Sequence, residues 1–181
     1  MKKIVIATLA LMTSMAFAAS VTLEGQDQQG ERGAVGSTNY AVSVKDSINN
    51  TFAADIGFAN YQQDNTKALS TRLETGITAA MPVGPVGLYA RTAIGEKYNN
   101  TKNFAYYSIE PGVTFNLGKV GFKLGYRYRD AVNEINLDKT RTGRVGVSYA
   151  LSNKDIIGVR YDKVTGDSWN HSYNVSYTRS F

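Results

Sequence analysis

Residues 170–181 of the sequence, NHSYNVSYTRSF, carry a two-residue rhythm that decides the fold. The odd-numbered positions hold mostly aromatic and apolar side chains, among them Tyr173, Val175 and Tyr177, while each even-numbered position holds a small polar side chain. Successive side chains of a β-strand point to opposite faces of the sheet. The segment therefore predicts a strand with one apolar face and one hydrophilic face.

The same alternation recurs along the chain upstream of this strand. In residues 120–129, for example, Val120, Phe122 and Leu124 alternate with glycine and basic residues. Ten segments show the pattern, at residues 20–26, 38–46, 51–61, 68–81, 86–96, 103–117, 120–130, 141–151, 155–164 and 170–181. Alternating segments of about ten residues, separated by turns, are typical of membrane barrels. The sequence predicts an all-β fold: a transmembrane up-and-down antiparallel β-barrel of about ten strands, with eight or twelve also open.

The links between these segments alternate between short and long. Short links lie at residues 46–50, 82–85, 118–119 and 152–154, and longer polar ones at residues 26–37, 62–67, 97–102, 131–140 and 165–169. Bacterial barrels have short periplasmic turns and longer extracellular loops. An even strand number places both ends of the barrel on the short-turn side, so the predicted topology is self-consistent.

The first 18 residues have the layout of a secretory signal peptide. Lys2 and Lys3 precede an apolar stretch at residues 4–12, and Ala16-Phe17-Ala18 forms a small-residue cleavage site. The apolar stretch is too short for a membrane-spanning helix, which needs roughly 20 residues. We therefore predict cleavage after Ala18, which leaves residues 19–181 as the barrel.

Composition excludes several other classes of protein. The 181-residue chain contains no cysteine, which excludes disulfides and thiolate metal sites. Its formal net charge of +5 is dispersed, without the basic run of a nucleic-acid-binding segment. The sequence shows neither a metal-ligand cluster nor a phosphate-binding loop, so we predict no cofactor, no metal and no nucleic-acid partner.

The C-terminal pattern is similar to that of a known class of proteins. Tyr173-x-Val175-x-Tyr177-x-x-x-Phe181 resembles the last strand of Gram-negative outer-membrane β-barrel proteins. This resemblance implies a small porin-type or structural barrel in the cell outer membrane, surrounded by outer-membrane lipid. It also implies that the barrel-assembly machinery reads these four residues. Arg179 stands where that class usually has an apolar residue, and near the membrane rim its side chain can snorkel toward water.

Charged side chains fall between the apolar positions and are therefore predicted to line the lumen. The basic set is Lys45, Arg72, Arg91, Lys123, Arg127, Arg129, Arg144 and Arg160. The acidic set is Glu24, Asp55, Glu74, Glu110 and Asp162. Five of the eight basic residues lie on three consecutive predicted strands, and most of the acidic residues lie on the first six. The two sets can therefore face one another across the lumen.

Two hypotheses follow for this lumen. In the first, paired charges fill the interior of a closed structural barrel, which acts through extracellular loops at residues 26–37 and 131–140. In the second, the lumen is a narrow porin-like channel for small, preferably anionic solutes. Barrels of about eight strands are filled by side chains and those of about sixteen are open, which favours the first. The second is favoured by small residues on the predicted lumen face: Gly57, Gly76, Gly87, Gly112, Gly121, Gly125, Gly146 and Gly158.

An enzymatic function is not predicted. Nucleophilic catalysis needs a base within hydrogen-bond reach of the nucleophile. The single histidine, His171, is followed by Ser172, but neighbouring strand residues point to opposite faces. We therefore predict no catalytic residue, and an interfacial position for His171 beside Trp169 and Tyr173.

Overall fold

Every strand of the protein pairs with two neighbours, and the first strand closes the sheet against the last. The computed structural model describes residues 19–33, 35–99, 103–136 and 138–181, so the predicted signal peptide lies outside the described residues. The strands are β1 (Ser20–Gly30), β2 (Ser37–Ser47), β3 (Phe52–Gln63), β4 (Leu69–Val83), β5 (Val86–Asn99), β6 (Asn103–Leu117), β7 (Val120–Ala131), β8 (Thr140–Ala150), β9 (Asp155–Gly166) and β10 (Asn170–Ser180). A short 3₁₀ turn, Glu134–Asn136, lies between β7 and β8.

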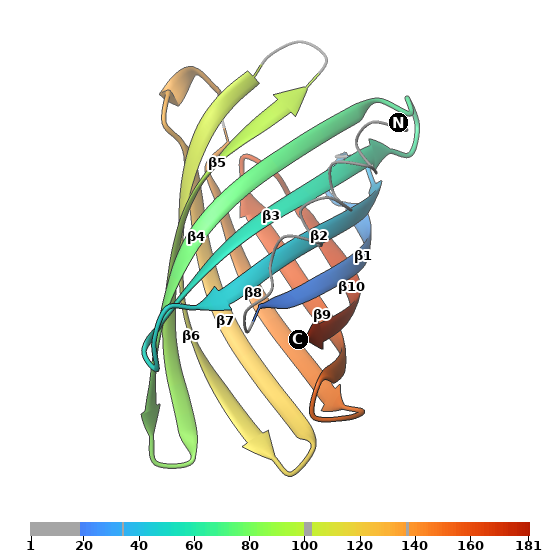
Figure 1. The fold of residues 1–181 in the computed structure, drawn as a ribbon. Coiled ribbons are helices and arrows are strands. Elements are labelled where there is room, and N and C mark those ends of the chain that lie inside the picture. The colour runs from blue at the N-terminus through green and yellow to red at the C-terminus, as the bar shows by residue number, and fades with distance from the viewer. Residues whose placement is uncertain (1–18, 34, 100–102, 137) are drawn as a thin grey trace.

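The sheet is a closed antiparallel barrel of ten strands in up-and-down order (Figure 1). β1 and β10 pair over their whole length, from Ser20 opposite Ser180 to Gly30 opposite Asn170. Closure leaves no sheet edge unpaired, which a sheet in lipid requires because no water is there to bond free N–H and C=O groups. The predicted fold class and strand number are confirmed.

Several strands extend farther than predicted at the end that carries the long loops, and β1 and β5 do so the most. β1 continues to Gly30 and β5 to Asn99, where the sequence predicts loops from residues 26 and 97. At these ends both faces of the strand are polar, so the alternation that marks a strand disappears although the pairing continues. The loop between β1 and β2 therefore begins at Glu31, and the predicted contact loop at residues 26–37 is shorter than expected.

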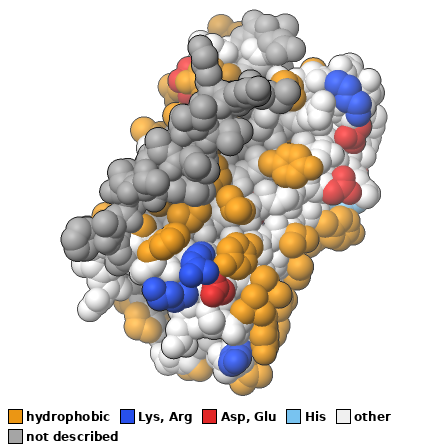
Figure 2. All heavy atoms as spheres, turned by 45° about the vertical axis from the view of Figure 1, so that its right-hand side comes forward, with side chains coloured by type: hydrophobic (Ala, Val, Ile, Leu, Met, Phe, Trp, Pro, Cys, Tyr) orange, Lys and Arg blue, Asp and Glu red, His pale blue; other side chains and the backbone are white. Residues whose placement is uncertain are grey.

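The outer face of the barrel is apolar. Figure 2 shows one side of the barrel, where groups of hydrophobic side chains are spread over the wall that is not drawn in grey. Ile77 and Val159, for example, are 52% and 58% exposed to solvent. An apolar surface of this extent marks a contact with lipid or protein, and on a closed barrel it is the face that lipid surrounds. Among the described residues, no helix is long and apolar enough to cross a bilayer.

The short turns gather at one end of the barrel, where β10 also ends (Figure 1). Gly84 and Gly118 adopt positive φ angles of 61° and 59° in the two-residue turns β4–β5 and β6–β7. Such turns need a left-handed residue, which glycine adopts without strain. By the usual arrangement of bacterial barrels, this end is periplasmic and the long-loop end is extracellular.

The C-terminal strand is held at the periplasmic end by contacts with its neighbours. The N–H of Phe181 donates to the carbonyl of Ala19, with an N···O distance of 3.2 Å. On the outer face, Arg179 Nη1 and the Tyr177 hydroxyl reach Asp155 Oδ1 at 3.2 and 2.6 Å. The position of Arg179 at the rim is the one in which a charged side chain is tolerated on a lipid-facing strand, because the pair can reach water.

Candidate functional site

The thirteen charged residues predicted for the lumen all lie on the inward face of the sheet. Residues that pair directly across neighbouring strands share a face. Lys45, for instance, pairs with Asp55, and Arg144 with Asp162. The burial pattern agrees, because Glu74, Glu110, Arg127 and Asp162 are all at most 9% exposed.

One group of these charges is built around Arg91 on β5. Its Nε and Nη2 donate to the two carboxylate oxygens of Asp55 on β3, at 2.9 and 2.5 Å. Its Nη1 donates to Glu74 on β4 at 2.7 Å, and the Tyr106 hydroxyl donates to the other oxygen of Glu74 at 2.9 Å. Bidentate guanidinium–carboxylate pairing fixes both orientation and charge, so Arg91 is fully neutralised.

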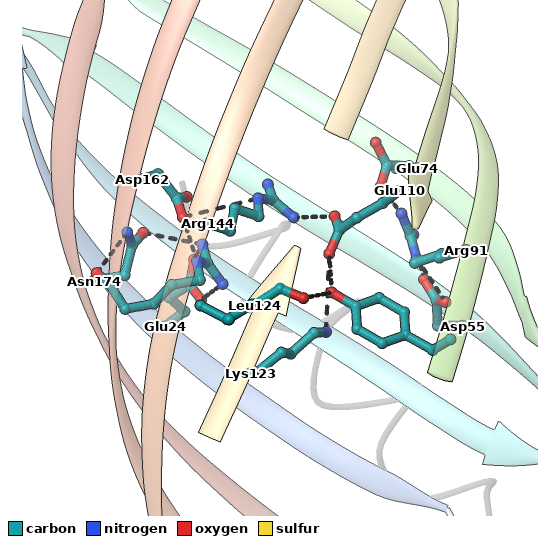
Figure 3. A network of polar contacts seen from close by, with 12 residues as sticks. Glu24, Asp55, Glu74, Arg91, Glu110, Lys123, Leu124, Arg144, Asp162 and Asn174 are labelled. Atoms are coloured by element: carbon teal, nitrogen blue, oxygen red, sulfur yellow. Dashed lines mark hydrogen bonds and ion pairs between the residues drawn. The ribbon is translucent and has the colours of Figure 1, made fainter. Parts of the chain in front are cut away.

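A second group surrounds Glu110 on β6 (Figure 3). Its carboxylate accepts hydrogen bonds from Arg144 Nη1 and, at 3.0 Å, from the Tyr89 hydroxyl. Lys123 Nζ lies 3.9 Å from Glu110 Oε1. The Glu110 side chain is only 3% exposed. A buried carboxylate needs such donors to offset the loss of its hydration.

A third group joins the end of the sheet to its beginning through Arg160 on β9. Arg160 donates to Asp162 at 2.9 Å and to both oxygens of Glu24 on β1 at 2.9 and 3.0 Å. It also donates to the side-chain oxygen of Asn174 at 3.2 Å. Arg144 Nε lies 3.8 Å from Asp162, which links this group to the second.

Together these groups form a belt of charge around the inside of the barrel wall (Figure 3). We call this the charged belt: Glu24, Asp55, Glu74, Arg91, Glu110, Lys123, Arg144, Arg160 and Asp162. Its pairs join strands one or two places apart, whereas the sequence suggested pairs across the lumen. Strand spacing explains the difference, because such neighbours are roughly 5–10 Å apart. Opposite walls of a barrel of this size are about 15–20 Å apart, beyond the reach of one ion pair.

Several of the inward glycines lie against larger side chains instead of widening the lumen as the sequence suggested. A Cβ atom on Gly76 would come within 2.7 Å of Arg91 Nη2, and one on Gly95 within 2.5 Å of the Tyr106 ring. A Cβ on Gly112 or Gly125 would overlap Tyr89. These glycines leave space for large side chains to lie flat against the wall, which places their polar ends at the charged belt.

On the extracellular side of the belt the lumen opens into a cavity of about 770 Å³, which we call the vestibule. Loop residues 31–33 and 167–169 contribute to its rim. Seven basic side chains line it, namely Arg32, Arg72, Lys97, Arg127, Arg129, Arg144 and Arg160. Four acidic side chains do so, namely Glu24, Glu31, Asp162 and Asp167. Basic side chains therefore outnumber acidic ones in the lining of the cavity.

One acidic loop residue pairs with two basic side chains of the vestibule wall. Asp138, in the β7–β8 loop, lies 2.8 Å from Arg129 Nε and 3.4 Å from Lys97 Nζ, and its side chain is 5% exposed. Sequence reasoning missed both Asp138 and Lys97, because it assigned them to loops. Alternation cannot place a loop side chain, so no sequence signal marked Asp138.

Arg72 and Arg127 differ from the other basic residues that the strands contribute to the vestibule wall. Neither has an ion pair or a side-chain hydrogen bond in the part of the chain that the structure describes. Arg127 is nevertheless only 8% exposed, and its Nε is buried without a partner. The Arg72 guanidinium lies 5.1 Å from the centre of the Tyr61 ring. Lys45, at the periplasmic end of the lumen, is exposed.

The extracellular rim carries a second polar cluster. Glu31 accepts hydrogen bonds from Lys163 and from His171, the latter at 2.7 Å. The Lys163 ammonium, followed by His171, holds the pKa of Glu31 below its usual value. The neighbouring Arg32 guanidinium lies 3.5 Å from the centre of the Trp169 ring. The β1–β2 loop is thereby attached to β9 and β10.

His171 and Ser172 lie on opposite faces of β10. His171 contacts the Tyr161 and Tyr173 rings on the outer face, at centroid distances of 6.2 and 6.0 Å. Ser172 is fully buried on the lumen side and accepts a hydrogen bond from Gln26 at 2.6 Å. The two side chains therefore do not form a catalytic pair. Within the described residues, no group of three or more His, Asp or Glu side chains is arranged to hold a metal ion.

Comparisons with known proteins agree with this architecture. The KdgM porin, solved in complex with disordered oligogalacturonate, has a TM-score of 0.53 and 14% identity, over 90% of this chain and 99% of that one. The NanC porin has a TM-score of 0.53 and 9% identity, over 89% and 100% of the two chains. The translocator domain of the autotransporter NalP from Neisseria meningitidis has a TM-score of 0.51 and 11% identity, over 99% and 94%. At these identities the likeness shows the fold alone.

The sequence itself identifies the family. No curated protein matches it significantly. The family model for Gram-negative porins, however, matches residues 10–168, which is most of the chain. This chain, a closed ten-stranded barrel with a charged lumen, therefore belongs to the Gram-negative porin family and lies in the outer membrane.

Proposed function

We propose that this barrel is a narrow channel that passes small solutes across the outer membrane and prefers anions. The observation that carries the proposal is the unequal charge of the vestibule, with seven basic and four acidic lining side chains. A cleft lined by one sign of charge with low-dielectric walls concentrates ions of the opposite sign. Anions entering from the extracellular side would therefore be enriched above the charged belt.

The charged belt itself supports a selective rather than a wide passage. It contains five acidic and four basic residues, so its charges nearly cancel. Because its ion pairs run along the wall between nearby strands, the belt would narrow the lumen from its sides. Preference for anions is then set by the vestibule, while the belt limits the size of solutes.

Acidic oligosaccharides are one class of solute that fits the proposal. The KdgM porin, which has the same fold, was solved in complex with oligogalacturonate, a chain of carboxylated sugars. A vestibule with excess positive charge suits carboxylates of this kind. The solute proposed here is accordingly a small organic acid or a short acidic sugar. We propose no catalytic role, since His171 and Ser172 face opposite sides.

The experiment that tests the channel is planar-bilayer recording on the refolded protein. Under a potassium chloride gradient, we expect discrete conductance steps. The reversal potential should be shifted toward the equilibrium potential of chloride. A cation-selective current would contradict the anion preference. The complete absence of current would favour the alternative, a closed structural barrel that acts through its extracellular loops.

A further inference from the structure

We infer that Arg72 and Arg127 form a carboxylate-binding site in the vestibule, on the extracellular side of the charged belt. The inference deepens the proposed function, on which it rests for the passage of the ligand. It names the two side chains that hold the solute before it reaches the narrow part of the lumen.

The first argument is the state of Arg127. Its side chain lines the vestibule and is 8% exposed, yet it has no ion pair and no side-chain hydrogen bond among the described residues. A buried charge without a partner is costly. An anion bound in the vestibule would supply the missing acceptors. Binding of such a ligand would explain why a buried arginine has no carboxylate partner in the described part of the protein.

The second argument is the electrostatic surroundings of Arg127. Arg129 lies two residues farther along the same face of β7, and Arg144 of β8 pairs with Gly125, two residues before Arg127. Two acidic groups, Glu74 and Glu110, also lie near Arg127. Glu74 is already bound by Arg91 and Tyr106, and Glu110 is bound by Arg144 and Tyr89. The protein thus concentrates positive charge at this point of the wall without a free carboxylate to balance it.

The third argument is the contrast with the other arginines of the lumen. Arg91, Arg129, Arg144 and Arg160 each have a carboxylate within 3.0 Å. Among the lumen arginines that lie on strands, Arg72 and Arg127 are the exceptions within the described residues. The Tyr61 ring lies beside the Arg72 guanidinium, an arrangement that restrains the side chain. Both fork-shaped donor groups therefore remain available to a ligand.

The chemistry of the guanidinium selects the ligand. Its planar fork matches a carboxylate, which it binds through two parallel hydrogen bonds. Chloride is a single spherical acceptor, so it cannot offer the two separate oxygen atoms that two parallel hydrogen bonds need. The cavity of about 770 Å³ is within the usual range for small-molecule sites. The ligand class is therefore a carboxylated solute, and one with several carboxylates can engage both arginines together.

Trp169 provides a direct test, because it is the one tryptophan of the chain and lines the vestibule. Refolded protein in detergent micelles is titrated with citrate at constant ionic strength while Trp169 fluorescence is recorded. We expect a saturable change for the wild type. Its apparent Kd should rise at least tenfold in Arg127→Gln and in Arg72→Gln. Sucrose, which has no charge, should produce no saturable change.

A matched control removes the same charge elsewhere. Arg141 is exposed on the outer face of β8, and Arg141→Gln should leave the citrate titration unchanged. Arg127→Lys keeps the charge without the fork and should weaken binding less than Arg127→Gln. Heat-dependent gel mobility checks that each variant is folded. Equal citrate binding by folded Arg127→Gln and wild-type protein would overturn the inference.

The outcomes also separate the site from the channel. Suppose that the current is anion-selective and that the apparent Kd for citrate is the same in the Arg72 and Arg127 variants as in the wild type. This result would refute the site and leave the proposed function standing. Citrate binding that needs Arg72 and Arg127 in a barrel that carries no current would refute the channel and leave the site standing. A response of the same size to chloride at equal ionic strength would show charge screening only, and would also refute the site.

Discussion

The Tyr89 ring lies flat against Gly112 of the neighbouring strand, and its hydroxyl donates to Glu110 Oε1 at 3.0 Å. Tyr89 pairs with Gly112 in the β5–β6 register. Gly112 therefore leaves room for the Tyr89 ring, and this places the Tyr89 hydroxyl at the Glu110 carboxylate of the charged belt. The position of Glu110 therefore depends on the Gly112 backbone and on the Tyr89 side chain. Arg144 and Lys123 contact the same carboxylate.

Replacement of Gly112 by alanine should destabilise the barrel by about 1–3 kcal/mol, the usual cost of overpacking. The new methyl group would overlap the Tyr89 ring and a backbone oxygen of Leu124. The measurement is the urea midpoint of folding in detergent or lipid. Gly57→Ala is the matched control, because its Cβ would lie 3.5 Å from Ser43, in ordinary contact. Equal effects of the two substitutions would contradict the prediction.

Replacement of Arg144 should lower the free energy of unfolding more than replacement of Arg179, which belongs to an exposed ion pair. Arg144→Gln leaves Glu110 with only a distant lysine and a tyrosine hydroxyl, and breaking a buried pair costs about 3–5 kcal/mol. Arg179→Gln breaks a pair whose arginine is 52% exposed. Water and salt screen such a pair, so its loss should lower the free energy of unfolding much less. Unfolding titrations measure both.

The double variant Arg144→Gln/Glu110→Gln tests whether this cost comes from the uncompensated carboxylate. We expect the double variant to be more stable than Arg144→Gln alone, because it no longer buries a free charge. Strict additivity of the two single effects would show that the pair is not coupled.

Acid should release the β1–β2 loop at the rim. The pKa of Glu31 is lowered by Lys163 and His171, so the contribution of its contacts is complete above the usual value of 4.5. It is lost as the pH falls through the lowered folded value. Trp169 fluorescence reports the change, because Arg32 next to Glu31 lies over its ring. Glu31→Gln should show the released signal already at neutral pH, and an unchanged acid transition in that variant would exclude Glu31 as the cause.

The outward residues Tyr173, Val175, Tyr177 and Phe181 carry the proposal that the barrel-assembly machinery reads the last strand. Phe181 is 62% exposed. Phe181→Ala should therefore lower the amount of barrel in the outer membrane several-fold and leave refolding in detergent unchanged. Leu151→Ala, at an exposed site in a periplasmic turn, is the control. An equal loss in both variants, or failure to refold in vitro, would contradict the proposal.

The sequence alone predicted the strands and their two faces because alternation is a local property. Whether Phe122 or Lys123 points outward depends only on its place in the strand, so the lipid face and the lumen face could be read residue by residue. The ends of β1 and β5 were missed where both faces become polar and the local signal disappears.

Which charges meet was decided only by the tertiary structure. Arg160 binds Glu24 although the two lie 136 positions apart, because closure of β1 on β10 brings β9 within two strands of β1. Asp138 and the free state of Arg127 likewise follow from strand register and loop position. The two-residue alternation predicts which face of the sheet a side chain occupies. The position of the side chain along the barrel axis, and its partner, depend on how all ten strands are offset around the closed barrel.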